Sequence, residues 1–240
     1  KDMTFGGVLA ESWENPDDVT YVFHLRHGVK FHNGRGMTSA DVVYSFDRIL
    51  GKTEYGDIGA LGSSASYFGG VESVEALDDY TVKFTLSAPN AAFMAGMTSS
   101  YGAIVCREVV EANGGSLSSV DTMCGTGPFK YSESVVDNHI TLVKNEDYWK
   151  ENAPKLDGIT FYLLGDESAR LAALRTGGVI ASERPAAVEA LLPVEENSSL
   201  SRSKLLRYEG FGAEDEREGR LGRASSSIHQ NRRRLLYTAS

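Results

Sequence analysis

The stretch from Leu9 to Leu50 constrains the fold most, because turn signals divide it into short β-rich segments and one helical segment. Residues 21–26 are rich in β-formers and end at a His-Gly pair, and residues 29–31 continue the same pattern. Asn33-Gly34 follows, a dipeptide typical of tight turns. This order predicts two strands joined by a turn, with a second turn leading into a helix.

The helix is predicted to begin after Thr38, because Asp41 stands three residues later, at the spacing of a capping box. In such a pair each side chain accepts a hydrogen bond from the backbone N–H of the other residue. Apolar residues then recur at helical spacing, so one helix face is expected to enter the core. These residues are Val42, Val43, Phe46, Ile49 and Leu50.

These residues resemble the signature of the extracytoplasmic solute-binding proteins of the dipeptide, oligopeptide and nickel ABC importers. That signature begins with LAESW and continues with Y-x-F-x-L-R-x-G-V-x-F-H-x-G. It ends with T-x-x-D-V-x-x-S-F and a basic residue. In this chain the three parts occupy residues 9–13, 21–34 and 38–48.

Three later segments extend the resemblance to about residue 180. The family has a G-T-G-P-F/Y turn, an N-x-x-Y-W segment at the end of a strand, and a D-x-x-x-R-x-x-A-L-x-x-G helix. They occupy residues 125–129, 145–149 and 166–177 here, in the family's order. The resemblance implies an α/β fold, periplasmic binding protein-like type II, with Trp13 and Trp149 in the core.

Other segments are assigned from their local patterns. Residues 71–77 and 81–86 alternate apolar and polar side chains around Asp78-Asp79, which predicts a hairpin. Glycine-rich residues 51–70 predict a loop passage. Residues 166–176 predict a helix with Leu171 and Leu174 facing inward and Arg170 facing outward. Further strands are expected at 130–134, 140–144 and 159–164.

The end of the chain departs from the family pattern. After the helix the family usually has G-E-V-D-I-A, whereas residues 177–181 are Gly-Gly-Val-Ile-Ala and lack the acidic residues. Farther on, Arg223, Asn231 and Arg232 match the polar spacings of a family helix whose apolar positions are polar here. Because such a helix has no face to bury, two interpretations stand. The tail is either divergent and loosely packed, or it differs from the natural protein.

Charge is divided unevenly along the 240 residues, whose formal net charge is −9. Residues 1–200 hold 15 Lys and Arg against 28 Asp and Glu, and residues 201–240 hold 9 against 5. The acidic body argues against nucleic acid as a partner. The basic tail, with Arg232 to Arg234, is compatible with nucleic acid or anionic lipid. We favour a solvated end.

No run of this sequence approaches the roughly 18 apolar residues that a membrane span needs. The first residues, Lys1 to Thr4, lack the apolar region of a signal peptide. We therefore expect an exported protein seen here in processed or truncated form.

Cys106 and Cys124 enclose 17 residues. In an exported protein an even number of cysteines favours a disulfide. A disulfide that closes a loop of this size stabilises the fold by about 3 kcal/mol. The alternative is two unlinked thiols. A catalytic cysteine is not predicted, because no histidine lies near either residue in the sequence.

The sequence predicts neither a metal site nor a catalytic site. His24, His27 and His32 lack metal-motif spacing, and side chains 24 and 27 of one strand point to opposite faces. No G-x-S-x-G or P-loop is present. Adjacent acids in turns usually point apart into solvent, whereas glycoside hydrolysis needs two converging acids. Such acids stand at Asp17-Asp18, Asp78-Asp79, Glu195-Glu196 and Glu214 to Glu216.

Ligand contacts are expected where aromatic residues stand in glycine-rich passages, since loops on a rigid scaffold often line binding sites. In the resembled family one lobe contributes segments like residues 55–68 and 98–101 to the cleft between lobes. Tyr67 and Tyr101 can stack on a small ligand or hydrogen-bond to it. The alternative is that they pack the lobe surface. The candidate ligand-binding residues are Tyr67, Phe68, Ser100 and Tyr101.

Together these observations predict one lobe of the fold, with the second lobe missing. Residues 1–157 are expected to form a strand-rich subdomain of the first lobe. Residues 158–240 would form a partial α/β part, with an atypical basic tail from about residue 201.

The function implied by the resemblance is non-catalytic and needs no cofactor or metal. A solute-binding component of an ABC importer would capture a peptide or similar small solute in the periplasm or another extracytoplasmic space. It would deliver that solute to the importer permease. Membrane association is expected only through the transporter or a lipid anchor, as in a cell-surface lipoprotein of a Gram-positive organism. The alternatives are a carboxylate-dependent hydrolase and an extracytoplasmic sensing module not coupled to a transporter.

Overall fold

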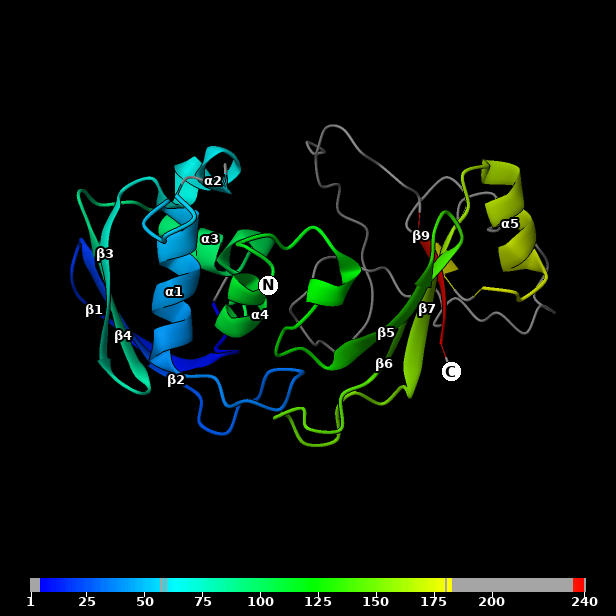
Figure 1. Ribbon diagram of the computed structural model, residues 1–240, viewed down its shortest axis with the longest axis horizontal. Helices are drawn as coiled ribbons and strands as arrows, with labels where there is room; N and C mark the ends of the chain where they lie inside the picture. The colour runs from blue at the N-terminus through cyan, green and yellow to red at the C-terminus, as the bar shows by residue number, and fades with distance from the viewer. Residues whose placement is uncertain (1–4, 57, 59, 180, 183–234, 240) are drawn as a thin grey trace. The chain divides into compact units, whose positions relative to one another are not determined.

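The computed structural model describes residues 5–56, 58, 60–179, 181–182 and 235–239. The chain divides into two compact units (Figure 1). The first contains residues 1–130 and 145–154, and the second contains residues 131–144 and 155–240. The predictions for the tail, including Glu195-Glu196, Glu214 to Glu216 and Arg232 to Arg234, lie outside the described residues.

The first unit is built on a four-stranded antiparallel sheet with the order β1-β2-β4-β3. Its strands are β1 (Ala10–Asp17), β2 (Thr20–Leu25), β3 (Val71–Asp78) and β4 (Thr81–Leu86). Burial alternates along β2 and β4, as expected for a sheet with one solvated face. Phe23 lies opposite Val82 in the register, so both enter the same core. The predicted β3–β4 hairpin is confirmed.

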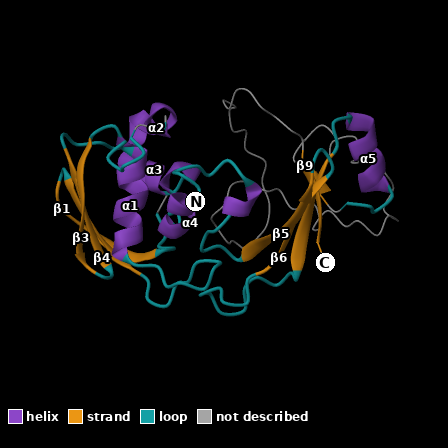
Figure 2. Cartoon of the chain, in the orientation of Figure 1, coloured by secondary structure: helices purple, strands orange, loops and turns teal. Residues whose placement is uncertain are grey.

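Helix α1 (Ser39–Ile49) lies against the inner face of this sheet (Figure 2). Its N-cap is Thr38, and the Asp41 carboxylate accepts a hydrogen bond from the Thr38 N–H at 2.9 Å, confirming the predicted capping box. Residues 29–31 do not form a full strand: Lys30 makes only an isolated bridge with Gly36. The reason is that β2 pairs with β1 and β4 instead.

Aromatic rings fill the space between α1 and the sheet. The Phe46 ring packs edge-on against Phe84 and Phe68, with centroids 4.8 Å and 5.1 Å away. Phe93 packs against Phe68 and Phe84 from the other side. All four side chains are at most 1% exposed. Edge-to-face pairs of this kind stabilise a core beyond the apolar area they bury.

Short helices complete the first unit. The glycine-rich passage predicted as a loop contains a helix over residues 60–68, because its last residue, Phe68, enters the core. The helices are α2 (Ala60–Phe68), α3 (Phe93–Met97), η1 (Ser100–Gly102), α4 (Arg107–Ala112) and η2 (Val120–Thr122).

The second unit has a five-stranded sheet with the order β5-β6-β7-β9-β8. Its strands are β5 (Phe129–Val135), β6 (His139–Lys144), β7 (Gly158–Leu163), β8 (Ala181–Ser182) and β9 (Leu235–Ala239). From the sequence, residues 131–144 are predicted to lie in the strand-rich subdomain. In the structure they belong to the second compact unit. They do so because β6 pairs with β7 beyond residue 157.

Helix α5 (Glu167–Arg175) follows β7 and begins at Asp166, whose Oδ1 accepts the Ala169 N–H at 2.9 Å. Leu174 is buried, as its spacing predicted. The prediction for Arg170 is wrong, because its side chain is 1% exposed and donates from Nη1 to the Leu164 carbonyl at 2.7 Å. Among the helices of the described residues, none combines the length and apolar character that a bilayer span requires.

Candidate ligand-binding surface

The structure brings together three of the four predicted ligand-binding residues. Tyr67 lies near the end of α2, while Ser100 and Tyr101 form the start of η1. The rings of Tyr67 and Tyr101 are 6.1 Å apart between centroids and tilted by 33°. Ser100 is exposed, and Tyr101 is 42% exposed. We call Tyr67, Ser100 and Tyr101 the tyrosine surface; its role in binding stays a prediction.

Polar contacts to the backbone fix the tyrosine surface. The Asn90 side chain donates to the Tyr67 carbonyl at 3.0 Å, which satisfies the end of α2. On the other side, the Tyr101 N–H donates to Ser99 Oγ at 3.2 Å. The Ser99 hydroxyl in turn donates to the Gly96 carbonyl at 2.6 Å. Hydrogen bonds therefore hold the backbone of both tyrosines in place.

Gly96 allows α3 to approach Tyr67 closely. A Cβ built on Gly96 would lie 2.6 Å from Tyr67 Cβ, closer than real Cβ contacts allow. Only a glycine fits at this position without displacing the ring.

Phe68 does not belong to this surface, and its prediction as a ligand contact is wrong. Its side chain is fully buried, at 0% exposure, and packs against Phe46 and Phe93. Because successive side chains of a helix point in different directions, Tyr67 reaches the surface while Phe68 enters the core.

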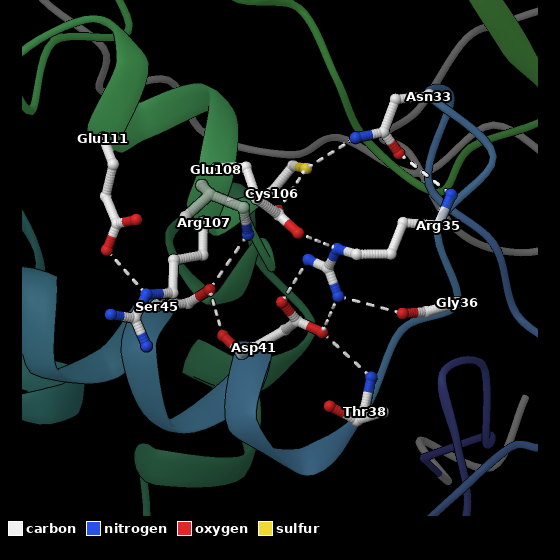
Figure 3. Close-up of polar contacts among 11 residues, drawn as sticks. Asn33, Arg35, Gly36, Thr38, Asp41, Ser45, Cys106, Arg107, Glu108 and Glu111 are labelled. Atoms are coloured by element: carbon white, nitrogen blue, oxygen red, sulfur yellow. Dashed lines mark hydrogen bonds and ion pairs between the residues drawn. The ribbon is translucent and has the colours of Figure 1, made fainter.

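A polar network joins the 33–36 turn to α1 and α4 (Figure 3). The Arg35 guanidinium pairs with Asp41 and also with Glu108. Asp41 sits in the first turn of α1 and Glu108 in the first turn of α4. The hydrogen bond to Asp41 raises the pKa of Arg35 despite partial burial. This network was missed from the sequence, where Asp41 was interpreted only as a capping residue.

Ser45 joins α1 to residues 103–106, the segment that precedes α4. Its hydroxyl, which is buried, donates to the Asp41 carbonyl at 2.7 Å and accepts the Val105 N–H at 2.9 Å (Figure 3). On the outer side of α4, Arg107 and Glu111 form an exposed pair at 2.6 Å. The arrangement orients the two helices, and its two acids, Asp41 and Glu108, are both paired with Arg35.

The predicted disulfide residues are both free thiols in the structure. Cys106 is buried, and Cys124 is half-buried against the same core. The Cys106 thiol donates to Glu108 Oε2 at 3.2 Å. Asn33 Nδ2 donates to Cys106 Sγ at 3.4 Å.

The three histidines considered as metal ligands have separate partners. His24 Nε2 lies 3.3 Å from Glu14 Oε1, His27 stacks on Tyr80, and His32 Nε2 lies 3.0 Å from the Gly127 carbonyl. Burial lowers the pKa of His32. In the part of the chain that the structure describes, no group of three His, Cys, Asp or Glu side chains is arranged to hold a metal ion.

In the acidic turns that the structure describes, an aspartate side chain accepts hydrogen bonds from backbone N–H groups of the same turn. Asp17 Oδ1 accepts the N–H groups of Val19 and Thr20 at 2.9 Å and 2.7 Å. Asp78 Oδ1 accepts the Tyr80 N–H at 2.8 Å. These backbone hydrogen bonds lower the pKa of both carboxyl groups. A carboxylate held ionised in this way serves as a turn cap.

The fold defines a class: one lobe of a mixed α/β periplasmic binding protein. The chain belongs to the family described as bacterial extracellular solute-binding proteins, family 5 Middle, which matches residues 4–214. Di/tripeptide-binding protein 1 of Pseudomonas aeruginosa is 34% identical over 204 residues, covering 76% of this chain. The dipeptide-binding protein of Escherichia coli is 34% identical over 184 residues, or 70% of this chain.

Solved structures agree with this assignment. The binding protein AgaA of A. tumefaciens R10, in complex with agropinic acid, has a TM-score of 0.67 at 33% identity, over 78% of this chain and 37% of its own. DppA of Helicobacter pylori, in complex with peptide STSA, has a TM-score of 0.61 at 34% identity, over 72% and 36%. The chain spans 37% of the Pseudomonas relative and 34% of the Escherichia relative.

Proposed function

We propose that this chain is part of the substrate-binding component of an ABC importer, which captures peptides or a similar small solute outside the cytoplasmic membrane. The observation that carries the proposal is the family match over residues 4–214. Relatives named for di/tripeptide and dipeptide binding, at 34% identity, support peptides as the solute. The protein acts without catalysis.

Binding is proposed to require two lobes that close around the ligand. The first compact unit then serves as the strand-rich subdomain of one lobe, and the second unit contributes to its α/β part. The loaded protein delivers its solute to the importer permease. Its location is the periplasm, or the cell surface through a lipid anchor in a Gram-positive organism.

The tyrosine surface is the proposed ligand contact on the described lobe. Tyr101 is exposed beside Tyr67, and hydrogen bonds with Asn90 and Ser99 hold the backbone of the two residues. A contact surface whose backbone is already ordered binds a ligand at a lower entropic cost. Ser100 adds a hydroxyl that can donate or accept a hydrogen bond.

Isothermal titration with a panel of di-, tri- and longer peptides tests this function. The full-length natural protein is expected to bind members of the panel, and this chain alone to bind them weakly. Sub-micromolar affinity of this chain alone overturns the two-lobe mechanism. Failure of the full-length protein to bind any peptide overturns the peptide assignment. Mass spectrometry of the incubated peptides adds a second check, since cleavage overturns the non-catalytic role.

A further inference from the structure

Cys106 and Cys124 belong to one hydrophobic core of the first unit although 17 residues separate them. Cys106 is buried in that core and Cys124 is half-buried against it. Neighbouring residues connect the two segments: the His32 N–H donates to the Gly125 carbonyl at 2.8 Å, and Asn33 Nδ2 donates to Cys106 Sγ at 3.4 Å. The 31–34 turn therefore contacts the Cys106 sulfur through the Asn33 side chain and the residue after Cys124 through the His32 backbone.

We propose that Cys106 and Cys124 form a disulfide bond outside the cytoplasm, tying α4 and residues 113–123 to the turn at 31–34. Two cysteines held close in the fold and an oxidising compartment are the two conditions for such a bond. The shared core and the contacts with the 31–34 turn support the first condition. The second rests on the extracytoplasmic location in the proposed function.

The bond forms by exchange with an oxidised dithiol, either a disulfide oxidoreductase of the compartment or oxidised glutathione. One cysteine thiolate attacks the oxidant's disulfide and releases the first oxidant thiol. The second cysteine then attacks the mixed disulfide, forming the Cys106–Cys124 bond and releasing the other oxidant thiol. Two protons and two electrons leave the cysteine pair, and the oxidant's disulfide becomes two thiols.

The surroundings set the order of these two attacks. Cys106 is 2% exposed whereas Cys124 is half-buried, so the oxidant reaches Cys124 first. Burial, followed by the hydrogen bond to Glu108, raises the pKa of Cys106 to about 11. Closure by Cys106 is therefore slow near neutral pH and accelerates as the pH rises, because the thiolate is the nucleophile. Glu108 Oε2, 3.2 Å from Cys106 Sγ, is placed to accept the thiol proton.

Oxidation rearranges the polar network of Figure 3. The Cys106 thiol loses its proton, so its hydrogen bond to Glu108 Oε2 disappears. Glu108 keeps its ion pair with Arg35. A covalent link closing this loop restricts the unfolded chain, and a melting temperature higher by roughly 5–10 °C is expected for the oxidised form.

Tryptic mapping gives a direct test, because Arg107 lies between the two cysteines. Trypsin produces the peptides 84–107 and 108–130, each with one cysteine and no internal Lys or Arg. The chain is exported to an oxidising compartment, quenched in acid, alkylated and digested without reduction. The expected product is the two peptides joined, with a mass two hydrogens below their sum. Reduction separates them.

A second experiment tests the disulfide in vitro, where the location of the protein plays no part. The purified chain is equilibrated with oxidised and reduced glutathione, and Cys124→Ser and Cys106→Ser serve as matched controls that cannot form the link. If excess oxidised glutathione yields two separately alkylated peptides, the two cysteines are not placed to bond, and the proposal is overturned. If the link forms in this buffer but is absent from the exported protein, the premise of an oxidising compartment is wrong, and the proposal is overturned as well. Peptide binding plays no part in either readout, so failure here is separate from failure of the proposed function.

Discussion

Arg35 and Asp41 form a two-point contact in which Nη1 lies 3.0 Å from Oδ2 and Nη2 lies 2.5 Å from Oδ1. The Asp41 side chain is 4% exposed, whereas that of Arg35 is 33% exposed. The same carboxylate accepts the Thr38 N–H. Asp41 therefore caps α1 and anchors the preceding turn at once, which explains why a buried acid is tolerated there.

Asp41→Asn is expected to lower the free energy of unfolding by about 2–4 kcal/mol. The amide retains an oxygen for the cap but removes the negative charge that faces Arg35 in a largely buried position. Breaking this contact costs more than losing a surface ion pair, because the buried Asp41 side chain loses two charge-assisted hydrogen bonds and Arg35 keeps only Glu108 as an ion-pair partner. Urea unfolding followed by circular dichroism measures the change.

The matched control is Glu111→Gln, which breaks the exposed pair with Arg107. Pairs of this kind contribute about 0.3–0.5 kcal/mol. If Asp41→Asn costs no more than Glu111→Gln, the two-point contact is not a stabilising feature of this fold.

Gly96→Ala is expected to destabilise the first unit by about 1–3 kcal/mol. The new methyl group would lie 2.6 Å from Tyr67 Cβ and 3.0 Å from the Phe68 ring, so α3 and α2 must separate. Overpacking of this kind typically has such a cost. Thermal and urea unfolding report the loss, and altered near-ultraviolet circular dichroism reports displacement of the Tyr67 ring.

Gly62→Ala provides the opposite control within α2. A Cβ at Gly62 meets nothing within 4 Å, and the residue lies inside the helix with no positive φ. Replacing a helical glycine at such a position stabilises by about 0.4–1 kcal/mol. Equal effects at the two glycines would contradict the close approach of α3 to α2.

Local signals were strong enough to predict α1, its cap and the β3–β4 hairpin from the sequence. Thr38 and Asp41 act within one turn of chain, and the period-two pattern of residues 71–86 needs only nearest neighbours. The family resemblance added the fold as a whole. Helix α2 was missed because its glycine and three serines favour a loop. Burial of Phe68 overrides that weak local preference.

Long-range polar contacts had no sequence signal. Arg35 and Glu108 are far apart in the chain, and their ion pair depends on how the 33–36 turn meets α4. Arg170 was placed outward because charged residues are usually exposed, yet two backbone carbonyls accept hydrogen bonds from its guanidinium. Tyr67 and Phe68 are both predicted as ligand contacts from the sequence, because their composition and spacing do not show that only Phe68 enters the core.

His32 is expected to make the stability depend on pH below neutrality. Burial lowers its folded-state pKa below 6.5. The neutral ring donates from Nε2 to the Gly127 carbonyl at 3.0 Å and accepts the Gly125 N–H at Nδ1 at 3.4 Å. Because the unfolded chain binds the proton more readily, this contribution is fully present above pH 6.5. It is lost as the pH falls from 6.5 through the folded-state pKa.

Two measurements check this expectation. NMR titration of the His32 ring should give a midpoint below 6.5 in the folded protein. Urea midpoints between pH 5 and pH 8 should fall less steeply toward acid for His32→Gln than for the unaltered chain. A titration midpoint above 6.5 would show that protonation strengthens the contact with Gly127, which reverses the sign of the effect.

Tyr101→Ala is expected to weaken peptide binding by the full-length natural protein roughly 2- to 10-fold, the equivalent of an aromatic contact worth about 0.5–1.5 kcal/mol. Tyr101 is 42% exposed, so its removal should leave the melting temperature nearly unchanged. Tyr101→Phe separates stacking from hydrogen bonding, since it keeps the ring and removes only the hydroxyl.

Tyr80→Ala is the matched control, because that ring stacks on His27 at the far end of β3 from α2. Titration calorimetry should therefore give Tyr101→Ala the lowest affinity for peptides and give Tyr80→Ala an affinity close to that of the unaltered protein. Equal affinities for all four proteins would mean that the tyrosine surface packs the lobe without touching the ligand.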